Sequence, residues 1–299
     1  MRTITRVLCP MDFSEASDHA LDHAIVLAGW FDASLVALHA YNPILLPVTG
    51  LATVEPGAAL PDDAELARLG DEMRGRLRRA LVEGIDTDVV VQIGPPTALI
   101  VEIAEKERAD LIVMGTHGAG GFERLVLGSV TEKVLRKAAC PVLTVPPRAE
   151  ATSTLPFKRL LCPVDFSEPS LAALRFALSL AQESEARLTI LHVVEWPVDD
   201  EPLVTRSFDV PEYRRAREAD VRDRLERLVP EEARDWCQPS LRIGHGKPYR
   251  AILGVAAEDA ADLVVMGVHG RNPLDLVLFG STTNHIVRQA TCPVLTLRR

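Results

Sequence analysis

The chain has 299 residues, 47% of them hydrophobic, which is enough for two domains of about 150 residues that each build a core. Its formal net charge is −9, its isoelectric point is near 5.4 and neither half is basic, which argues against nucleic acid as the main partner. No apolar run approaches the roughly 18 residues of a membrane span, and residues 1–5 lead into a strand without a signal peptide, so we expect a cytoplasmic protein with no membrane partner.

The first half alternates apolar strands with helical patterns. We predict strands at 4–9, 34–41, 88–93, 111–114 and 142–145. We predict helices at about 14–30, 62–83, 97–106 and 130–138, the first of them capped by Ser14. The stretch 42–61 is predicted as a long apolar loop that packs over a helix or a partner.

The second half repeats the first at nearly constant spacing, so that residues of the first half recur in matching contexts: Cys9, Asp12, Ser14 and His39 as Cys162, Asp165, Ser167 and His192. Its predicted strands lie at 159–162, 187–194, 240–243, 263–266 and 294–297, and the arginine-rich run 214–227 is predicted as a solvated, salt-bridged helix face. A polar, proline-punctuated linker lies at 146–156. We therefore predict a tandem duplication with domains at 1–147 and 156–299.

Strands that are apolar on both faces and alternate with helices indicate an α/β fold with a parallel sheet covered on both sides. In such open sheets the ligand crevice lies at the carboxyl ends of the strands. Asp12, the turn at Gly94 and Gly115 all follow predicted strand ends. We therefore expect these residues to converge on one edge of the sheet.

The pattern G-x2-G-x9-G-S follows a predicted strand in each half, from Met114 and again from Met266. Glycines let a ligand approach the backbone, and the first N–H groups of a helix attract an anion. The pattern predicts a phosphate site, and the alternative is a turn followed by a helix cap. A Walker P-loop, G-x-x-x-x-G-K-[ST], is absent.

Other polar residues near the predicted sites leave alternatives open. Asp12 and Asp165 could contact a ribose, a base or a divalent cation, or could cap the helix that follows. The histidines of the glycine loops, His117 and His269, are interpreted as structural rather than as bases, because no partner acid or nucleophile is apparent. The five cysteines are interpreted as small core residues rather than as zinc ligands or disulfides.

The sequence resembles the universal stress protein family over both halves. The resemblance rests on V-L-C-P-M-D-F-S, the L-H strand, M-G-T-H-G-x9-G-S-V-T-E-K-V and the closing C-P-V-L-T-V. The G-x2-G-x9-G-[ST] pattern marks the ATP-binding branch of that family. The resemblance implies, for each half, a Rossmann-like domain of the adenine nucleotide alpha hydrolase type, with a five-stranded parallel sheet in the order 3-2-1-4-5.

The resemblance also implies two sets of nucleotide-binding residues. The first set is Pro10, Asp12, Ala40, Gly115, His117, Gly118, Gly128, Ser129, Val130 and Thr131. The second set is Pro163, Asp165, Val193, Gly267, His269, Gly270, Gly280, Ser281, Thr282 and Thr283. The expected ligand is ATP with Mg²⁺, and no catalytic residue is assigned. Pro273 in the second loop departs from the pattern because proline lacks a backbone N–H.

Taken together, the resemblance and the motifs predict an ATP-binding stress-response or regulatory protein with no or very slow ATP hydrolysis. The family likeness further implies domain pairing through the fifth strand of each half and a homodimer formed through edge strands. Two alternatives remain at this point. One is a slow ATPase, and the other is an interaction module that binds a non-nucleotide ligand or an unknown regulatory protein.

Overall fold

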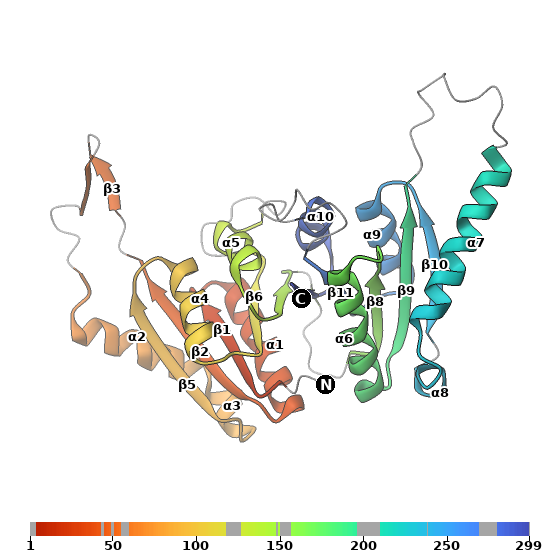
Figure 1. Ribbon diagram of the computed structural model, residues 1–299. Coiled ribbons are helices and arrows are strands. Elements are labelled where there is room, and N and C mark those ends of the chain that lie inside the picture. The colour runs from red at the N-terminus through yellow and green to blue at the C-terminus, as the bar shows by residue number, and fades with distance from the viewer. Residues whose placement is uncertain are drawn as a thin grey trace. The chain divides into compact units, whose positions relative to one another are not determined.

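A computed structural model of the protein describes residues 4–42, 45–48, 51–54, 60–117, 127–147, 149, 157–195, 210–237, 239–268 and 280–298. Contacts between Cα atoms divide the chain into two compact units, Arg2–Leu155 and Pro156–Arg299. In Figure 1 the first unit runs from red to yellow-green and the second from green to blue. Each unit is a parallel sheet with helices on both faces, as the sequence predicts.

The sheet of the first unit contains five strands: β1 (Arg6–Met11), β2 (Ser34–Tyr41), β5 (Thr87–Ile93), β6 (Leu111–Gly115) and β7 (Val142–Val145). They lie in the order β7-β6-β1-β2-β5, and every pair is parallel. Numbered along the chain and read from the β5 edge, this is the order 3-2-1-4-5, so the predicted fold is confirmed. Its helices are α1 (Glu15–Phe31), α2 (Asp63–Arg76), α3 (Arg78–Val82), α4 (Pro96–Lys106) and α5 (Ser129–Lys137).

The sheet of the second unit repeats this arrangement. Its strands are β8 (Arg159–Pro163), β9 (Arg187–Val194), β10 (Ser240–His245), β11 (Leu263–Gly267) and β12 (Val294–Leu297), in the order β12-β11-β8-β9-β10. Its helices are α6 (Glu168–Ser184), α7 (Val210–Leu228), α8 (Ala233–Trp236), α9 (Pro248–Glu258) and α10 (Ser281–Gln289). The arginine-rich run lies in α7, most of whose described side chains are exposed, as predicted.

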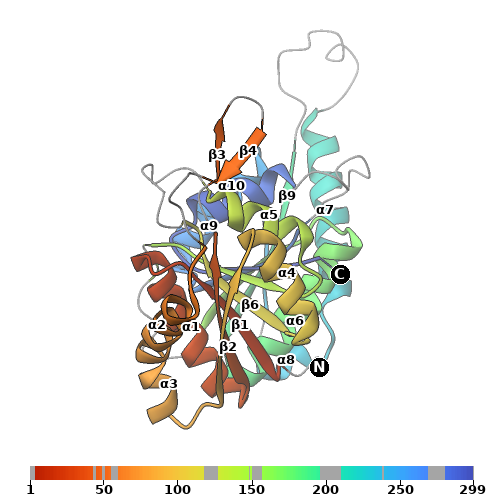
Figure 2. The ribbon, with the colours of Figure 1, turned by 90° about the vertical axis from the view of Figure 1, so that its left-hand side faces the viewer.

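The core of the first unit lies on both faces of its sheet. Figure 2 looks at the β5 side of that sheet, with α1, α2 and α3 on one face and α4 and α5 on the other. All five residues of β6 are buried, and Leu8, Leu35 and Ile112 are fully enclosed. Burial on both faces explains why these strands read as continuous apolar runs rather than as alternating ones.

Two predicted elements differ from the structure. The stretch 42–61 is not a loop throughout, because β3 (Leu45–Val48) and β4 (Leu51–Val54) form an antiparallel pair. The sequence carries a signal for this hairpin, since two runs rich in strand-forming residues flank Thr49-Gly50. The predicted packing of this stretch lies outside the described side chains. The predicted helix 62–83 is broken at Leu77, which is buried and has a ψ of 0°.

The five cysteines all lie within the described residues, and none forms a disulfide. Four are buried, and Cys140 is half-buried. Burial raises the thiol pKa of Cys237 to about 11 and that of Cys292 to about 12, as expected for cysteines that serve as core residues. Across the described ranges, no helix is long and apolar enough to cross a membrane.

His23, in α1, makes the first domain sensitive to acid. Its pKa is lowered from 6.5 to about 4, chiefly by burial and to a smaller extent by the charge of His19. The bond of Nδ1 to the His19 carbonyl and the charge of Asp22 act in the opposite direction. Because the folded pKa lies below the unfolded one, the unfolded chain binds more protons between these values. His23 therefore contributes stability that is present above about pH 6.5 and is lost as pH falls towards about 4.

We expect His23→Phe, which places the residue found at the matching position 176 of the second half, to reduce this acid sensitivity. The free energy of unfolding should fall less between pH 6.5 and 4 in the variant than in the natural protein. Urea unfolding at a series of pH values measures the difference, and carboxylates elsewhere affect both proteins equally. Parallel pH profiles for the two proteins would contradict the assignment to His23.

Candidate functional site

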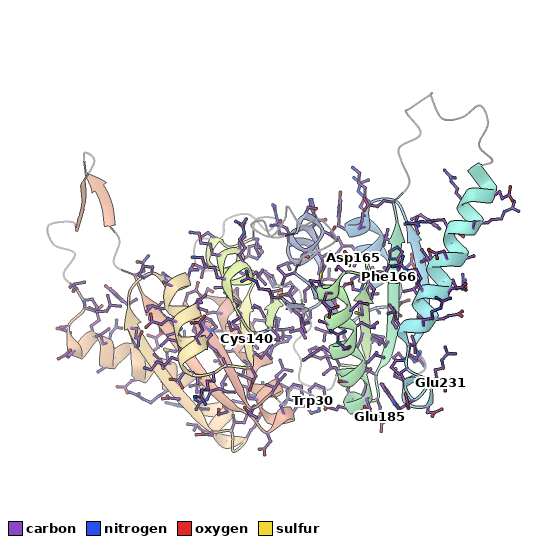
Figure 3. The ribbon with its side chains drawn as sticks, viewed as in Figure 1. Trp30, Cys140, Asp165, Phe166, Glu185 and Glu231 are labelled. Carbon is purple, nitrogen blue, oxygen red and sulfur yellow. The ribbon has the colours of Figure 1, made fainter. Side chains whose placement is uncertain are left out.

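Residues that the sequence assigns to the second site line one cavity of about 390 Å³ at the carboxyl ends of β8, β9 and β11. These residues are Pro163, Asp165, Val193, Gly267, Gly280, Ser281, Thr282 and Thr283. His269 and Gly270 lie outside the described residues. Figure 3 labels Asp165 and Phe166 where the chain leaves β8. The cavity lies where open parallel sheets bind ligands.

The first site is built on the corresponding elements of the first unit. Pro10 lies in β1, Ala40 in β2, and Gly115 ends β6, while Gly128 to Thr131 form the start of α5. Asp12 directly follows β1 and is exposed. His117 follows β6, and Gly118 lies outside the described residues. The structure thus brings the predicted residues to the carboxyl edge of this sheet as well.

The helices that begin at these sites differ from α1 and α6 in how they are capped. In α1 and α6 the hydroxyl oxygens of Ser14 and Ser167 accept a hydrogen bond from the N–H three residues later, at 3.2 and 3.4 Å. α5 and α10 begin after Gly128 and Gly280 and have no side-chain cap. Their first N–H groups therefore remain suited to an external anion at the positive end of the helix dipole.

One buried threonine in each domain holds the start of the helix against the end of the preceding strand: Thr131 at the start of α5, and Thr283 at the start of α10. The Thr131 hydroxyl donates to the Gly115 carbonyl at 2.9 Å, and the Thr283 hydroxyl is 3.2 Å from the Gly267 carbonyl. The Gly128 N–H also donates to the Thr116 carbonyl at 2.9 Å. The threonine hydroxyl protons are therefore used within the protein, which the motif alone did not indicate.

The strand-end glycines are required by packing as well. A Cβ atom on Gly115 would lie 2.9 Å from the Ala16 carbonyl oxygen, and one on Gly267 would lie 2.8 Å from the Pro169 carbonyl carbon. Real Cβ atoms do not approach backbone this closely, so α1 and α6 can pack on these strands only if the residue is glycine. The sequence suggested a phosphate role for Gly115 and gave no sign of this contact with α1.

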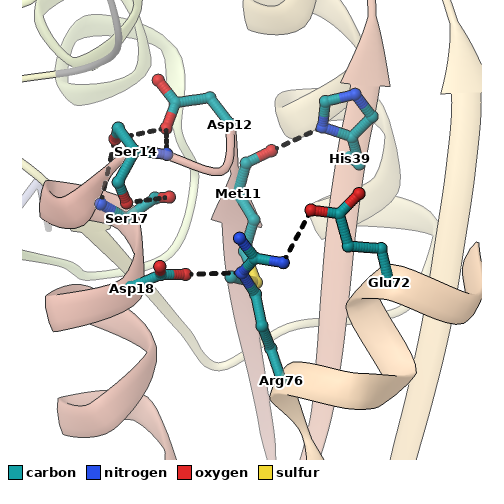
Figure 4. Close-up of polar contacts among 8 residues, drawn as sticks. All are labelled: Met11, Asp12, Ser14, Ser17, Asp18, His39, Glu72 and Arg76. Carbon is teal, nitrogen blue, oxygen red and sulfur yellow. Dashed lines mark hydrogen bonds and ion pairs between the residues drawn. The ribbon is translucent and has the colours of Figure 1, made fainter. Parts of the chain in front are cut away.

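The aspartates take part in the start of the helix that follows them. Oδ1 of Asp12 accepts hydrogen bonds from the Ser14 N–H at 3.1 Å and from the Ser14 hydroxyl at 2.5 Å (Figure 4). Oδ1 of Asp165 makes the same two bonds to Ser167, at 3.0 and 2.5 Å. The aspartates therefore take part in capping α1 and α6 indirectly, because each holds the serine whose hydroxyl oxygen caps the helix. Since one oxygen of each carboxylate has this role, its orientation is fixed.

Between each aspartate and serine lies a phenylalanine in the left-handed region. The φ of Phe13 is 62° and that of Phe166 is 65°. A non-glycine residue there costs about 1–2 kcal/mol, so its surroundings must hold it. His39 and His192 lie against these rings, at centroid distances of 4.5 and 4.7 Å. Each histidine therefore packs on the residue that follows the aspartate.

The histidine of the first glycine loop is also bonded within the protein. Nδ1 of His117 lies 2.8 Å from the Thr116 hydroxyl, so this contact involves a neighbouring side chain. A bond of this kind fits the interpretation of His117 as a structural residue. Within the described residues, no group of three histidine, cysteine or carboxylate residues could hold a metal ion by itself.

Eight residues that line the second cavity are not in the predicted set, namely Val164, Ser170, Leu191, His192, Met266, Glu195, Pro248 and Ile252. The last three form a side of the cavity that sequence reasoning missed. Glu195 follows β9, and the other two lie in the first turns of α9, after β10. The strand-end rule, applied to β9 and β10 as it was to β8 and β11, would have found this side of the cavity. These residues extend the site across the sheet, away from the start of α10.

Comparisons of this chain with family models, known sequences and solved structures all match the same protein family. The universal stress protein family model matches residues 3–146 and 156–298. Universal stress protein MJ0531 of Methanocaldococcus jannaschii is 36% identical over 148 residues, which are 47% of this chain and 81% of that protein. Universal stress protein Rv2005c of Mycobacterium tuberculosis is 27% identical over 302 residues, 98% of this chain and 97% of that protein. A crystal structure of a universal stress protein from Archaeoglobus fulgidus has the same fold, with a TM-score of 0.68, 23% identity, and coverage of 99% of this chain and 97% of that one.

Proposed function

Because this chain belongs to the universal stress protein family, we propose that it is an ATP-binding stress-response or regulatory protein with no or very slow ATP hydrolysis. Each of two domains, 1–147 and 156–299, holds one nucleotide with Mg²⁺. The protein acts in the cytoplasm as a homodimer that pairs through edge strands. The observation that carries this proposal is the cavity of about 390 Å³ at the start of α10, a helix without a side-chain cap.

The residues of the second cavity fit the parts of a nucleotide. The first N–H groups of α10 and the Ser281 hydroxyl suit the phosphates. The Asp165 carboxylate suits a ribose hydroxyl or the cation, since Mg²⁺ is commonly held by one or two carboxylates together with phosphates. Apolar surface from Val193 and Ile252 suits a base. A volume of this size is within the range of small-molecule sites.

The arrangement supports binding more than hydrolysis. Rapid hydrolysis needs a positioned base for water and donors aimed at the transferred phosphoryl group. The one histidine among the described residues that line the cavity, His192, has its Nδ1 2.7 Å from the Val164 carbonyl and its ring against Phe166. Those contacts suit a residue that supports the site from behind. A slow ATPase is the alternative, and steady turnover that Asp12→Asn and Asp165→Asn abolish would favour it.

We expect protein purified without added nucleotide to release ATP when it is denatured. Two ATP molecules per chain would support two sites. About one would support a single filled site, and the loop around Pro273 is the sequence difference between the halves that would explain it. Chromatography of the released material identifies and counts the nucleotide. No released nucleotide, together with no heat of ATP binding in the presence of magnesium, would contradict the proposal and favour the interaction module.

A further inference from the structure

The loop between β1 and α1 has the same unusual conformation as the loop between β8 and α6. Phe13 and Phe166 both have a positive φ, 62° and 65°, although neither is a glycine. In an Asx-turn, the aspartate side chain accepts a hydrogen bond from the N–H two residues later, so the backbone conformation of the residue between them decides where that N–H points. The serine N–H thereby reaches Oδ1 of the aspartate, at 3.1 Å in the first loop and 3.0 Å in the second. The orientation of each aspartate therefore depends on the phenylalanine.

Each phenylalanine ring also contacts an arginine from a helix that lies, along the chain, between the second and third strands of the sheet. The guanidinium carbon of Arg76, in α2, lies 4.8 Å from the Phe13 ring centre, and that of Arg224, in α7, lies 3.8 Å from the Phe166 ring centre. Both distances are within the range of a cation–π contact. Arg76 is itself held by Asp18 at 2.8 Å and Glu72 at 2.9 Å, as Figure 4 shows.

The histidine on the neighbouring strand completes the arrangement. Nδ1 of His39 lies 2.8 Å from the Met11 carbonyl, and Nδ1 of His192 lies 2.7 Å from the Val164 carbonyl. These carbonyls immediately precede the two aspartates in the chain. The histidine thus holds the backbone just before the aspartate and also packs on the phenylalanine just after it.

The two arginines are not copies inherited at one position of the repeat. Measured back from the matching residues Gly94 and Gly246, Arg224 stands about one helical turn farther away than Arg76 does. The same contact is therefore made from two different helical positions. Phe166 and Arg224 are also absent from the lining of the second cavity, as far as the described residues define it, whereas Asp165 is part of that lining.

We propose that Arg76 and Arg224 are positioning residues for the two sites. Each arginine holds the phenylalanine of its domain in the left-handed conformation, and that conformation holds the aspartate carboxylate towards the bound nucleotide. Nucleotide affinity thereby depends on the placement of α2 and α7, two helices that supply no residue to the nucleotide set. This inference rests on the proposed function, because it assigns a role at the same sites.

The test is ATP titration calorimetry, with magnesium, on the full chain freed of nucleotide. Arg76→Leu should weaken binding at the first site by roughly 3- to 10-fold, the effect of losing one cation–π contact. The second site is an internal reference and should keep its affinity. The matched control is Arg74→Leu, on the same helix, which removes an exposed arginine that pairs with Asp71 and should leave both affinities unchanged. Arg76→Lys, which keeps a cation near the ring, should retain most of the affinity.

A double-mutant comparison separates positioning from a general loss of stability. If Arg76 acts through Asp12, then Arg76→Leu should have little further effect on affinity in an Asp12→Asn background. Phe13→Gly is a second variant, because glycine adopts the left-handed conformation without strain but lacks the ring. It should weaken the first site as Arg76→Leu does, even if Arg76→Leu itself folds poorly.

Three outcomes would overturn the inference. Unchanged affinity in Arg76→Leu and Phe13→Gly, with natural protein that binds ATP, would reject the positioning role and leave the proposed function intact. Additive effects of Arg76→Leu and Asp12→Asn would show that Arg76 does not act through the aspartate. Absence of ATP binding by the natural protein would reject the proposed function and this inference together.

Discussion

Gly267→Ala is expected to destabilise the second domain by about 1–3 kcal/mol, the usual cost of forcing a methyl group into closely packed structure. The new Cβ atom would lie 2.8 Å from the Pro169 carbonyl carbon and 3.0 Å from its oxygen. Because these are backbone atoms, neither can rotate away, and α6 has to move off β11. Since α6 begins beside Asp165, ATP affinity at the second site should fall as well. Urea unfolding and ATP titration measure the two effects.

Gly254→Ala provides the matched control in the same domain. Gly254 lies in α9, is exposed, and a Cβ atom there would meet nothing within 4 Å. Alanine in a helix interior is favoured over glycine by roughly 0.5–1 kcal/mol, so this variant should be more stable. If Gly267→Ala instead kept the stability and affinity of the natural protein, the close approach of α6 to β11 would not be what requires glycine at position 267.

The glycines of the repeated pattern have different structural roles, which the sequence reveals only in part. The repeated G-x2-G-x9-G-S spacing correctly marked the strand end and the start of α5, because both glycines occupy backbone positions with special demands. The spacing could not show whether a glycine is required by close packing of a helix or by the start of a helix, because both favour the same residue. Gly115 is enclosed by α1, whereas Gly128 starts a helix without a side-chain cap. The first demand comes from a helix about 100 residues earlier in the chain, which no local pattern includes.

The strands of each sheet could be predicted, because the residues that indicate a strand lie within or next to it in the sequence. Apolar runs, their turn residues and Ser14 at the start of α1 gave the five sheet strands of each half to within a few residues. The strand order came from family resemblance, since parallel pairing leaves little trace in sequence. The hairpin of β3 and β4 was missed because the long predicted loop was read as one unit, although two strand-forming runs flank Thr49-Gly50.

The surroundings of Asp12 could not be predicted, for a different physical reason. Phenylalanine has no intrinsic preference for the left-handed region, so Phe13 adopts it only because distant groups hold it there. One of these groups, His39, lies on the next strand, and another, Arg76, lies on a helix beyond the stretch 42–61. The repeat did not help, because Arg76 and Arg224 stand at different positions in their helices.

Ser129→Ala and Ser281→Ala are expected to weaken ATP binding without lowering stability. Each serine is the first residue of its helix and is exposed, and neither helix has a side-chain cap to lose. A hydroxyl that donates to a phosphate makes a charge-assisted hydrogen bond worth about 1.5–3 kcal/mol, or roughly 10- to 100-fold in affinity at each site. Calorimetry of each single variant should show one weakened and one unchanged site, and the double variant should show two weakened sites.

Thr131→Val is the control that separates binding from support in the first domain. The Thr131 hydroxyl is buried and bonded to the Gly115 carbonyl, so its loss removes an internal hydrogen bond and should lower stability by about 1–3 kcal/mol. Ser129→Ala should therefore lower ATP affinity and leave the free energy of unfolding unchanged, whereas the main effect of Thr131→Val should be a lower free energy of unfolding. Unchanged ATP affinity in both Ser129→Ala and the double serine variant would mean that the starts of α5 and α10 do not hold phosphate. The first N–H groups of both helices would then be satisfied by water or by another ligand.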